Sequence, residues 1–183
     1  MGLGTRYPFV ERILRRAYRG GRVLEIAAGG ALYGDLFERY VATDLPTTPY
    51  ARPGDLGVAC DAGALPFRVG SFDLVFVVAA LFSIPDPGWV GQQVWMCLRP
   101  GGRFLVFDYT QGTQRRALLN NLRRGNPRRF AFWSRSGLAQ VLYECGFHRV
   151  RQRHRSLAEG LLWAVPGCGD RWGQWLILQA EKG

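Results

Sequence analysis

Two kinds of segment alternate along the chain. Short runs that are apolar at nearly every position alternate with stretches in which apolar residues recur every three or four positions. The first kind is typical of parallel strands buried on both faces, and the second is typical of the helices that cover them. The predicted strands are 22–27, 40–44, 57–61, 72–79, 103–108, a weaker one within 147–155, and 175–180. The predicted helices are 8–19, 32–39, 89–98 and 136–145. This order predicts an α/β fold, with a mostly parallel, Rossmann-like sheet covered by helices on both faces.

The length of the chain predicts one domain. Its 183 residues suffice for one full core but leave little room for a second, and 48% hydrophobic residues exclude a disordered chain. We expect residues 1–20 to form a lead-in helix and residues 109–135 to form a basic insertion that covers the substrate. No window approaches 18 consecutive apolar residues, and the first residues lack the layout of a secretory signal, so a cytoplasmic protein is expected.

Positive charge is concentrated in the C-terminal part. Residues 1–108 carry 11 Arg against 10 acids, whereas residues 109–183 carry 12 Arg and one Lys against 4 acids. The segment 109–135 combines seven arginines with apolar and aromatic residues and has no acid. Three interpretations remain open for it: a solvated helix face, a pocket for an anionic or lipid-linked acceptor, or a patch that binds nucleic acid or a membrane surface.

The cysteines predict no metal site. Cys60, Cys97, Cys145 and Cys168 are widely separated, and none has a Cys or His nearby at the spacing of a zinc site. We therefore interpret them as thiols without a metal.

A glycine turn follows the first predicted strand, in the sequence VLEIAAGGA of residues 23–31. Such a turn is where nucleotide cofactors sit in sheets of this kind, because the backbone can approach the ligand closely. The spacing fails the Gly-x-Gly-x-x-Gly pattern of dinucleotide sites, and no Gly-Lys-Ser/Thr is present. Glu25 would repel a pyrophosphate but would favour a ligand carrying an ammonium or sulfonium.

Three acids end three successive predicted strands. They are Glu25, Asp44 and Asp61, and each alone could equally cap a turn. Together they predict one site, in which Asp44 accepts both ribose hydroxyls of a nucleoside and Asp61 accepts a hydrogen bond from an adenine amino group.

Six motifs extend this pattern over residues 20–150. They are VLEIAAGGA, VATDLP, CDAGALPF, SFDLVFVVAALFSIPDP, LRPGGRFLVFDY and FWSRSGLAQVLYECGF. In this order the chain resembles the class I S-adenosylmethionine-dependent methyltransferases, and in particular the small-molecule branch with the ubiquinone and menaquinone methyltransferases. The resemblance implies a seven-stranded sheet whose last strand is antiparallel to the others.

The resemblance also implies a set of residues for the cofactor, S-adenosyl-L-methionine. Glu25 and the backbone of 27–29 would hold its methionine part, Asp44 its ribose, Leu45 would pack near the adenine, and Asp61 would bind the adenine amino group. The complete set is Glu25, Ala27, Gly29, Asp44, Leu45, Asp61, Ala62, Val78 and Ala79.

Two departures from the family pattern concern the chemistry. Ala31 replaces the last glycine of the turn, and a positive φ there would cost about 1 kcal/mol because of its methyl group. The segment 79–83 is nearly apolar and offers no general base. The catalytic residue stays unknown; Asp108 and Tyr109 are weak candidates, equally well interpreted as a cap and an aromatic wall.

The predicted function is methyl transfer from S-adenosylmethionine to a small-molecule acceptor. The main alternative is a non-catalytic, methyltransferase-like binding or partner subunit, and a less favoured one is an RNA methyltransferase. The sequence leaves open the acceptor, the methylated atom and the oligomeric state, since acceptor pockets are built from variable loops.

Overall fold

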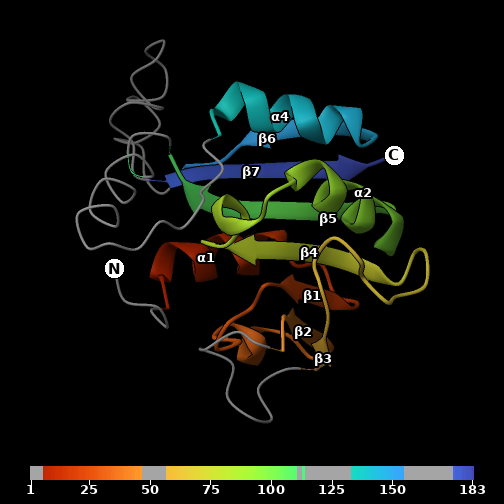
Figure 1. The fold of residues 1–183 in the computed structure, drawn as a ribbon. Helices are drawn as coiled ribbons and strands as arrows, with labels where there is room; N and C mark the ends of the chain where they lie inside the picture. The colour runs from red at the N-terminus through yellow and green to blue at the C-terminus, as the bar shows by residue number, and fades with distance from the viewer. Residues whose placement is uncertain (1–5, 47–56, 111–112, 114–132, 155–174) are drawn as a thin grey trace.

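The computed structural model describes residues 6–46, 57–110, 113, 133–154 and 175–183. In this part of the chain, seven strands form one sheet in the order β3-β2-β1-β4-β5-β7-β6 (Figure 1). The strands are β1 (Val23–Ile26), β2 (Tyr40–Asp44), β3 (Val58–Ala59), β4 (Phe72–Val78), β5 (Leu98–Tyr109), β6 (Phe147–Gln152) and β7 (Trp175–Lys182). The helices are α1 (Pro8–Ala17), α2 (Pro87–Cys97) and α4 (Arg135–Glu144), with short 3₁₀ helices η1 (Gly34–Leu36) and η2 (Leu81–Ser83).

Strand direction confirms the predicted mixed sheet. Strands β1 to β5 pair in parallel, whereas β7 is antiparallel to both of its neighbours, β5 and β6. The strand order reverses between β1 and β4, and in open α/β sheets ligands bind outside the carboxyl ends of the strands at such a point. The fold therefore places its candidate site above β1, β2 and β4.

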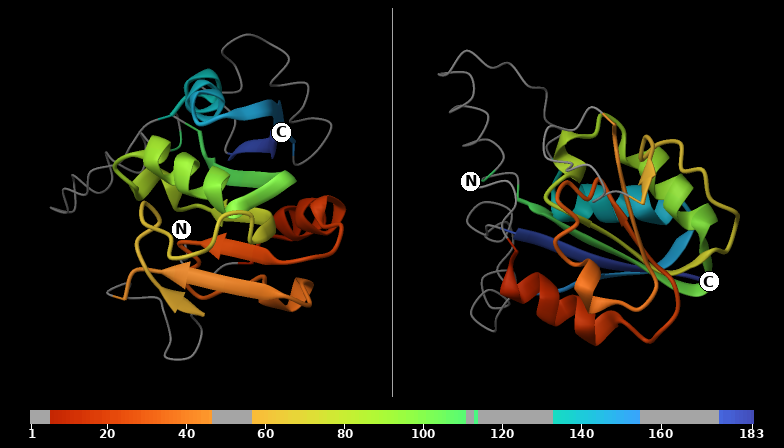
Figure 2. Two further views of the ribbon diagram at one scale, coloured as in Figure 1. Left: turned by 90° about the vertical axis from the view of Figure 1, so that its right-hand side faces the viewer. Right: turned by 90° about the horizontal axis from the view of Figure 1, so that it is seen from below.

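Two apolar cores lie on opposite faces of the sheet. Helices α2 and α4 cover one face, and α1 covers the other (Figure 2). Strands β4 and β5 contribute alternate side chains to both cores, which is why their sequences are apolar at successive positions. Every residue of β1 is buried, including its one acid.

Helix α1 has the face that its sequence predicts. Val10, Ile13, Leu14 and Ala17 are buried against the sheet, while Arg15 pairs with Glu11 one turn earlier at 2.9 Å. Burial of such an apolar stripe stabilises a helix more than its own propensity does. None of the described helices is long and apolar enough to cross a membrane.

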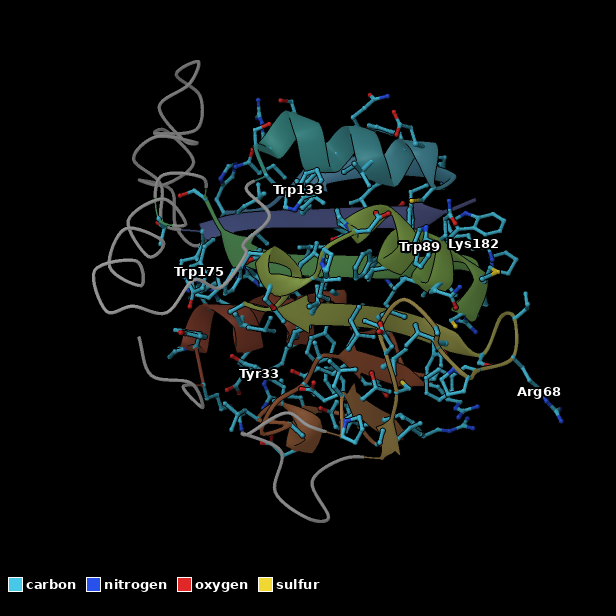
Figure 3. The ribbon with its side chains drawn as sticks, in the orientation of Figure 1. Tyr33, Arg68, Trp89, Trp133, Trp175 and Lys182 are labelled. Carbon is cyan, nitrogen blue, oxygen red and sulfur yellow. The ribbon has the colours of Figure 1, made fainter. Side chains whose placement is uncertain are left out.

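Lys182, the single lysine of the sequence, fastens β7 to the end of α2. Its Nζ donates to the carbonyl oxygens of Trp95 at 2.7 Å and Leu98 at 2.8 Å, and it lies 3.9 Å from the centroid of the Trp95 ring. Trp95 lies in the last turn of α2 and Leu98 is its C-cap residue, at the end of the helix where the dipole favours a cation. Lys182 is thus a buried cap that joins two elements distant in sequence (Figure 3).

The predicted helix at 32–39 is wrong. The chain there forms turns and only the short η1, and Phe37 is already extended at φ −134°. Gly34 lies so close to the Tyr40 ring that an added Cβ would come within 2.9 Å of it. The apolar side chains are buried as expected, but a tight turn rather than a helix places them there.

The other predicted bounds differ only at their ends. Strand β3 is shorter than predicted, and β5 begins earlier because Leu98 pairs with Phe72 before a register shift. Helix α2 starts two residues early, since the Asp86 side chain accepts hydrogen bonds from the amides of Gly88 and Trp89.

Candidate functional site

The loop after β1 is held against the end of β2. The Gly29 amide donates to Asp44 Oδ2 at 2.7 Å, and the Ala28 amide donates to the Thr43 carbonyl at 2.9 Å. Asp44 Oδ1 accepts from the Leu45 amide at 2.7 Å. The Asp44 carboxylate is therefore fixed between two loops, and a carboxylate offers about four acceptor positions in all.

The same loop has an unusual backbone. Ala27 has φ 51°, Gly29 has φ 56° and Ala31 has φ 48°, so every second residue is in the left-handed region. This conformation costs an alanine about 1 kcal/mol or more, because its Cβ approaches the backbone oxygen. Ala31 therefore has the positive φ for which a cost in conformational free energy is expected from the sequence, and Ala27 has one as well. At Gly29 an added Cβ would meet no atom within 4 Å, so the loop leaves open space there.

Glu25 lies beneath this loop with 2% of its surface exposed. The hydroxyl of Tyr40 donates a short hydrogen bond to its carboxylate. Burial raises the pKa of Glu25 to about 8, the Tyr40 hydrogen bond opposes this rise, and the charge of Asp44 adds to it. The carboxylate is therefore poised to ionise when a positive charge approaches. The role of Tyr40 beside Glu25 was not predicted, because in the sequence Tyr40 is only the first residue of a strand.

Asp61 lies next to Asp44 along the sheet edge. β2 and β3 pair Asp44 with Ala59, and the Cys60 amide donates to the Asp44 carbonyl at 2.9 Å. Asp61 is exposed and its Oδ1 accepts from the Gly63 amide at 2.7 Å. The structure thus brings the three predicted acids to one edge, Glu25 buried, Asp44 nearly so and Asp61 exposed.

The segment after β4 borders the site from the other side. Val78 and Ala79 are half-buried, Ala79 has φ 52°, and its amide donates to the Phe107 carbonyl at 2.7 Å. Leu45 is 46% exposed and presents an apolar side chain above β2, while Ala62 is half-buried against the core.

Asp108 ties the end of β5 to η2. Its Oδ2 accepts from the Phe82 amide at 2.8 Å, its Oδ1 accepts from the Tyr109 amide at 2.7 Å, and it is 2% exposed. Burial raises the pKa of Asp108 to about 7, although both hydrogen bonds oppose that rise. These contacts match a positioning role, the cap interpretation that the sequence left open.

An aromatic cluster, defined here as Tyr7, Phe9, Phe82, Tyr109 and Trp175, lies beside the end of β5. Trp175 is 4.8 Å from Tyr7, 5.1 Å from Phe9 and 4.7 Å from Tyr109, measured between ring centroids. Phe82 meets Tyr109 at 5.6 Å. The sequence by itself indicates only Tyr109 as an aromatic wall. The cluster joins four segments that are distant in the sequence, and the tryptophan at the start of the last strand is the one sequence feature that points to it.

The lead-in segment is fastened to the loop after β1. The Tyr7 amide donates to the Tyr33 hydroxyl at 2.9 Å, and Arg6 pairs with Asp35 at 2.8 Å and with Glu11 at 2.9 Å. Tyr33 is 2% exposed, at the same end of the molecule as Trp175 (Figure 3). The lead-in helix therefore starts next to the candidate site.

The site chemistry fits one kind of cofactor. Three carboxylates, an open backbone at Gly29 and an exposed apolar side chain at Leu45 suit a cationic nucleoside, and no lysine or arginine stands in the loop 27–31 to meet a phosphate. Within the described residues no group of three or more His, Cys, Asp or Glu side chains could hold a metal ion. Cys60, Cys97 and Cys145 are free thiols, and Cys168 lies outside the described residues.

Comparison with known proteins agrees with this chemistry. Residues 20–106 match the family described as a methyltransferase domain. A demethylmenaquinone methyltransferase of Beutenbergia cavernae is 30% identical over 84% of this chain and 78% of its own length. A 2-methyl-6-phytyl-1,4-hydroquinone methyltransferase of Synechocystis is 33% identical over 45% of this chain and 22% of its own length.

A solved structure shares the fold. Phosphoethanolamine N-methyltransferase 2 of Haemonchus contortus, in complex with phosphomonomethylethanolamine and S-adenosylhomocysteine, superposes with a TM-score of 0.69 at 17% identity, over 93% of this chain and 51% of that one.

The chain belongs to the class I S-adenosylmethionine-dependent methyltransferases, in the quinone methyltransferase branch. It is an enzyme that uses S-adenosylmethionine to methylate a small-molecule acceptor, as its sequence predicted, and nothing found favours a non-catalytic subunit or an RNA methyltransferase.

Proposed function

We propose that the acceptor is a hydroquinone or a related ring compound that carries an apolar chain. The observation that carries this proposal is the aromatic cluster at the end of β5, because aromatic side chains bind a planar ring through stacked or edge-to-face contacts. The names of two relatives, one acting on demethylmenaquinone and one on a phytyl hydroquinone, support the same class. Tyr109 would contact the ring, and Asp108 would hold Tyr109 and η2 in place.

The cofactor would lie across the loop after β1. Glu25 and the backbone of Ala27 and Gly29 would hold its methionine part, and Asp44 would accept its ribose hydroxyls. Leu45, Asp61 and the Ala62 amide would surround the adenine, and Val78 and Ala79 would line the site after β4. All of these residues lie at the carboxyl edge of the sheet. When bound, the sulfonium supplies an activated methyl group.

The residues of this chain would then act by placement. Displacement at a sulfonium methyl group has a good leaving group, so alignment of the acceptor supplies much of the rate. The Phe82 and Tyr109 amides hold Asp108 on both oxygens, which keeps η2 at the end of β5 and fixes one wall of the acceptor pocket. Glu25, beneath the loop, would stabilise the positive charge of the cofactor before transfer.

We propose also that residues 1–183 act as one domain in which the segment 109–135 covers the acceptor. Residues 111–112 and 114–132 of that segment lie outside the described residues. The support is the position of Tyr109, which is the first residue of the segment and belongs to the aromatic cluster through its contacts with Phe82 and Trp175.

Calorimetric titration with S-adenosylhomocysteine tests the cofactor site. We expect Asp44→Ala to weaken binding by roughly 100-fold, since hydrogen bonds to a charged group contribute about 1.5–3 kcal/mol each. The matched control, Glu38→Ala, removes an exposed acid from the turn before β2 and should change the dissociation constant less than about twofold. Equal losses in both variants would contradict the assignment of Asp44.

Transfer of a radiolabelled methyl group tests the acceptor. A hydroquinone with a short alkyl chain should accept the label, and phosphoethanolamine, which has no ring, should not. Labelling of phosphoethanolamine alone would overturn the proposed acceptor class while leaving the cofactor site intact.

A further inference from the structure

An arginine face lies on the side of the sheet that α1 covers in part. It is defined by five side chains: Arg19 after α1, Arg103 on β5, and Arg149, Arg151 and Arg153 on and just beyond the edge strand β6.

The register of the sheet places these side chains together. Arg149 is opposite Glu181 and Arg151 is opposite Gln179, while Arg103 on β5 is also opposite Glu181. Partners in a sheet project to the same face, whereas successive residues of one strand project to opposite faces. Arg149 and Arg151 therefore share the face of Arg103, which contacts the end of α1. Val150, between two of them, packs into the core on the other face.

Hydrogen bonds anchor part of this face without neutralising it. Arg103 donates to the Ala17 carbonyl at the end of α1 at 2.7 Å, and Arg153 donates to Gln179 Oε1 at 2.8 Å. Arg149 lies 3.8 Å from Glu181 and is 58% exposed. Burial lowers the pKa of Arg103, the positive charges of Arg19 and Arg153 lower it further, and Glu181 opposes them. The arginines are therefore close enough to repel one another.

A hollow continues the face at the amino-terminal edge of the sheet. Its volume is about 300 Å³, and its lining includes Arg19, Arg99 and Arg103. Asp73 is also there, paired with Arg99 at 2.5 Å, so the hollow keeps net positive charge. A hollow of this size can accept a phosphate headgroup.

We propose that the arginine face docks the enzyme on an anionic phospholipid bilayer. Charge complementarity is the first argument, since five arginines with Glu181 among them form a surface that attracts phosphate headgroups. Along β6, Arg149, Arg151 and Arg153 follow one another at intervals of roughly 7 Å and lead toward the start of β7, where the acceptor pocket is proposed.

A bilayer fits this face better than a nucleic acid does. The exposed large apolar side chains of the described chain, Leu45, Val69, Trp89, Met96 and Tyr143, are not among its residues, so it offers no exposed aromatic platform for bases. The choice also rests on the proposed function, because an acceptor with an apolar chain is dissolved in a bilayer. An enzyme docked through this face would meet its acceptor where the acceptor resides.

Co-sedimentation with vesicles tests the docking. The full chain should sediment with vesicles of equimolar phosphatidylcholine and phosphatidylglycerol, should release as salt rises, and should not bind phosphatidylcholine alone. The variant Arg149→Gln with Arg151→Gln should bind the anionic vesicles roughly 30-fold more weakly.

A second double variant controls for net charge. Arg39→Gln with Arg68→Gln removes the same charge from the turn before β2 and from the loop before β4, where Arg68 points away from the body of the molecule (Figure 3). It should lower vesicle binding less than about threefold. Equal losses in the two variants would overturn the proposal, because binding would then depend on overall charge alone.

Two further measurements separate the possible failures. The double variant, Arg149→Gln with Arg151→Gln, should methylate a short-chain hydroquinone in solution at the rate of the unmodified enzyme. When the acceptor is embedded in anionic vesicles, the double variant should be slower than the unmodified enzyme. Normal turnover in solution without preference for anionic vesicles would overturn the docking and leave the proposed function standing. Binding to anionic vesicles without methyl transfer to any hydroquinone would overturn the proposed function and leave the docking standing. Tighter binding to single-stranded RNA than to vesicles, lost in the same variant, would assign the face to nucleic acid.

Discussion

The two halves of the sheet edge are built by different means. The half above β1 and β2 contains a loop with several residues at positive φ and three acids. Of these acids Glu25 is the most buried and Asp61 is exposed. The half above β5 and β7 consists of aromatic rings contributed by four segments of the chain. The first half suits a ligand of fixed shape and charge, and the second suits a flat apolar ring, so cofactor and acceptor should respond to different substitutions.

In the cofactor half, Glu25→Gln should remove most of the pH dependence of cofactor binding. A cationic cofactor favours the ionised carboxylate, so affinity of the unmodified enzyme should rise with pH up to about 8 and then level off. The variant should bind roughly tenfold more weakly at pH 8.5, with little change between pH 6 and 8.5. Titration calorimetry in buffers of different ionisation enthalpy would also detect the proton released on binding.

Tyr40→Phe gives the matched control for this dependence. The Tyr40 hydrogen bond lowers the pKa of Glu25, so its loss should move the midpoint of the affinity profile to higher pH. A midpoint that stays in place would mean that another group causes the pH dependence.

Glu25 should also make the stability of the protein depend on pH. Rising pH, which favours cofactor binding, should lower the free energy of unfolding. The pKa of Glu25 is higher in the folded chain than its ordinary 4.5, so the folded chain holds a proton that the unfolded chain releases, and the free energy of unfolding falls as pH rises from about 4.5 to 8. Asp108 acts with the same sign between about 3.8 and 7. Denaturant unfolding of Glu25→Gln should show a shallower decline, with the Asp108 part remaining. An unchanged slope would indicate that Glu25 stays ionised in the folded chain.

Tyr109→Ala should have an intermediate effect, confined to the acceptor half. Loss of the ring contacts with Trp175 and Phe82 should raise KM for the acceptor about tenfold, since one such contact contributes about 0.5–1.5 kcal/mol. The dissociation constant of the cofactor should change less than about twofold. Tyr109→Phe keeps the ring and should behave nearly as the unmodified enzyme. If Tyr109→Ala weakened cofactor and acceptor equally, the two halves would not be separable.

Substitutions in the loop after β1 should have the smallest effects, and their signs should differ. Ala31→Gly removes a methyl group from a left-handed residue and should raise the free energy of unfolding by up to about 1 kcal/mol. Ala28→Gly, at a neighbouring residue without positive φ, should lower it by a few tenths to about 1 kcal/mol, because glycine gains freedom in the unfolded chain. Denaturant titrations compare the two. A decrease for Ala31→Gly would show that the loop is not strained there.

The sequence predicted what depends on local pattern. Strands such as β4 and β5 are apolar at successive positions because both of their faces are buried. Glu25, Asp44 and Asp61 lie near or just after the ends of β1, β2 and β3, at positions that the family motifs indicate. The predicted helix at 32–39 is wrong because the same spacing of apolar residues also suits a series of turns, and the close approach of the Tyr40 ring to Gly34 is a contact that the spacing does not encode.

Contacts that depend on the order of the strands in the sheet could not be predicted from the sequence. Tyr40 meets Glu25 because β2 lies beside β1, and Trp175 meets Tyr7 and Tyr109 because β7 enters next to β5. The arginine face arises in the same way, since Arg103 and Arg149 are both opposite Glu181. Each is a neighbour relation between distant segments, which periodicity does not encode.

Acylation of Lys182 can be used to measure local opening of the protein. The residue is 7% exposed and its Nζ donates to two carbonyls. Acylating reagents should therefore find no other lysine side chain and should reach this one only when β7 separates from α2. The rate at which Lys182 is acylated, followed by mass spectrometry of the peptide that contains it, would then measure how often this edge of the sheet opens, without an introduced label.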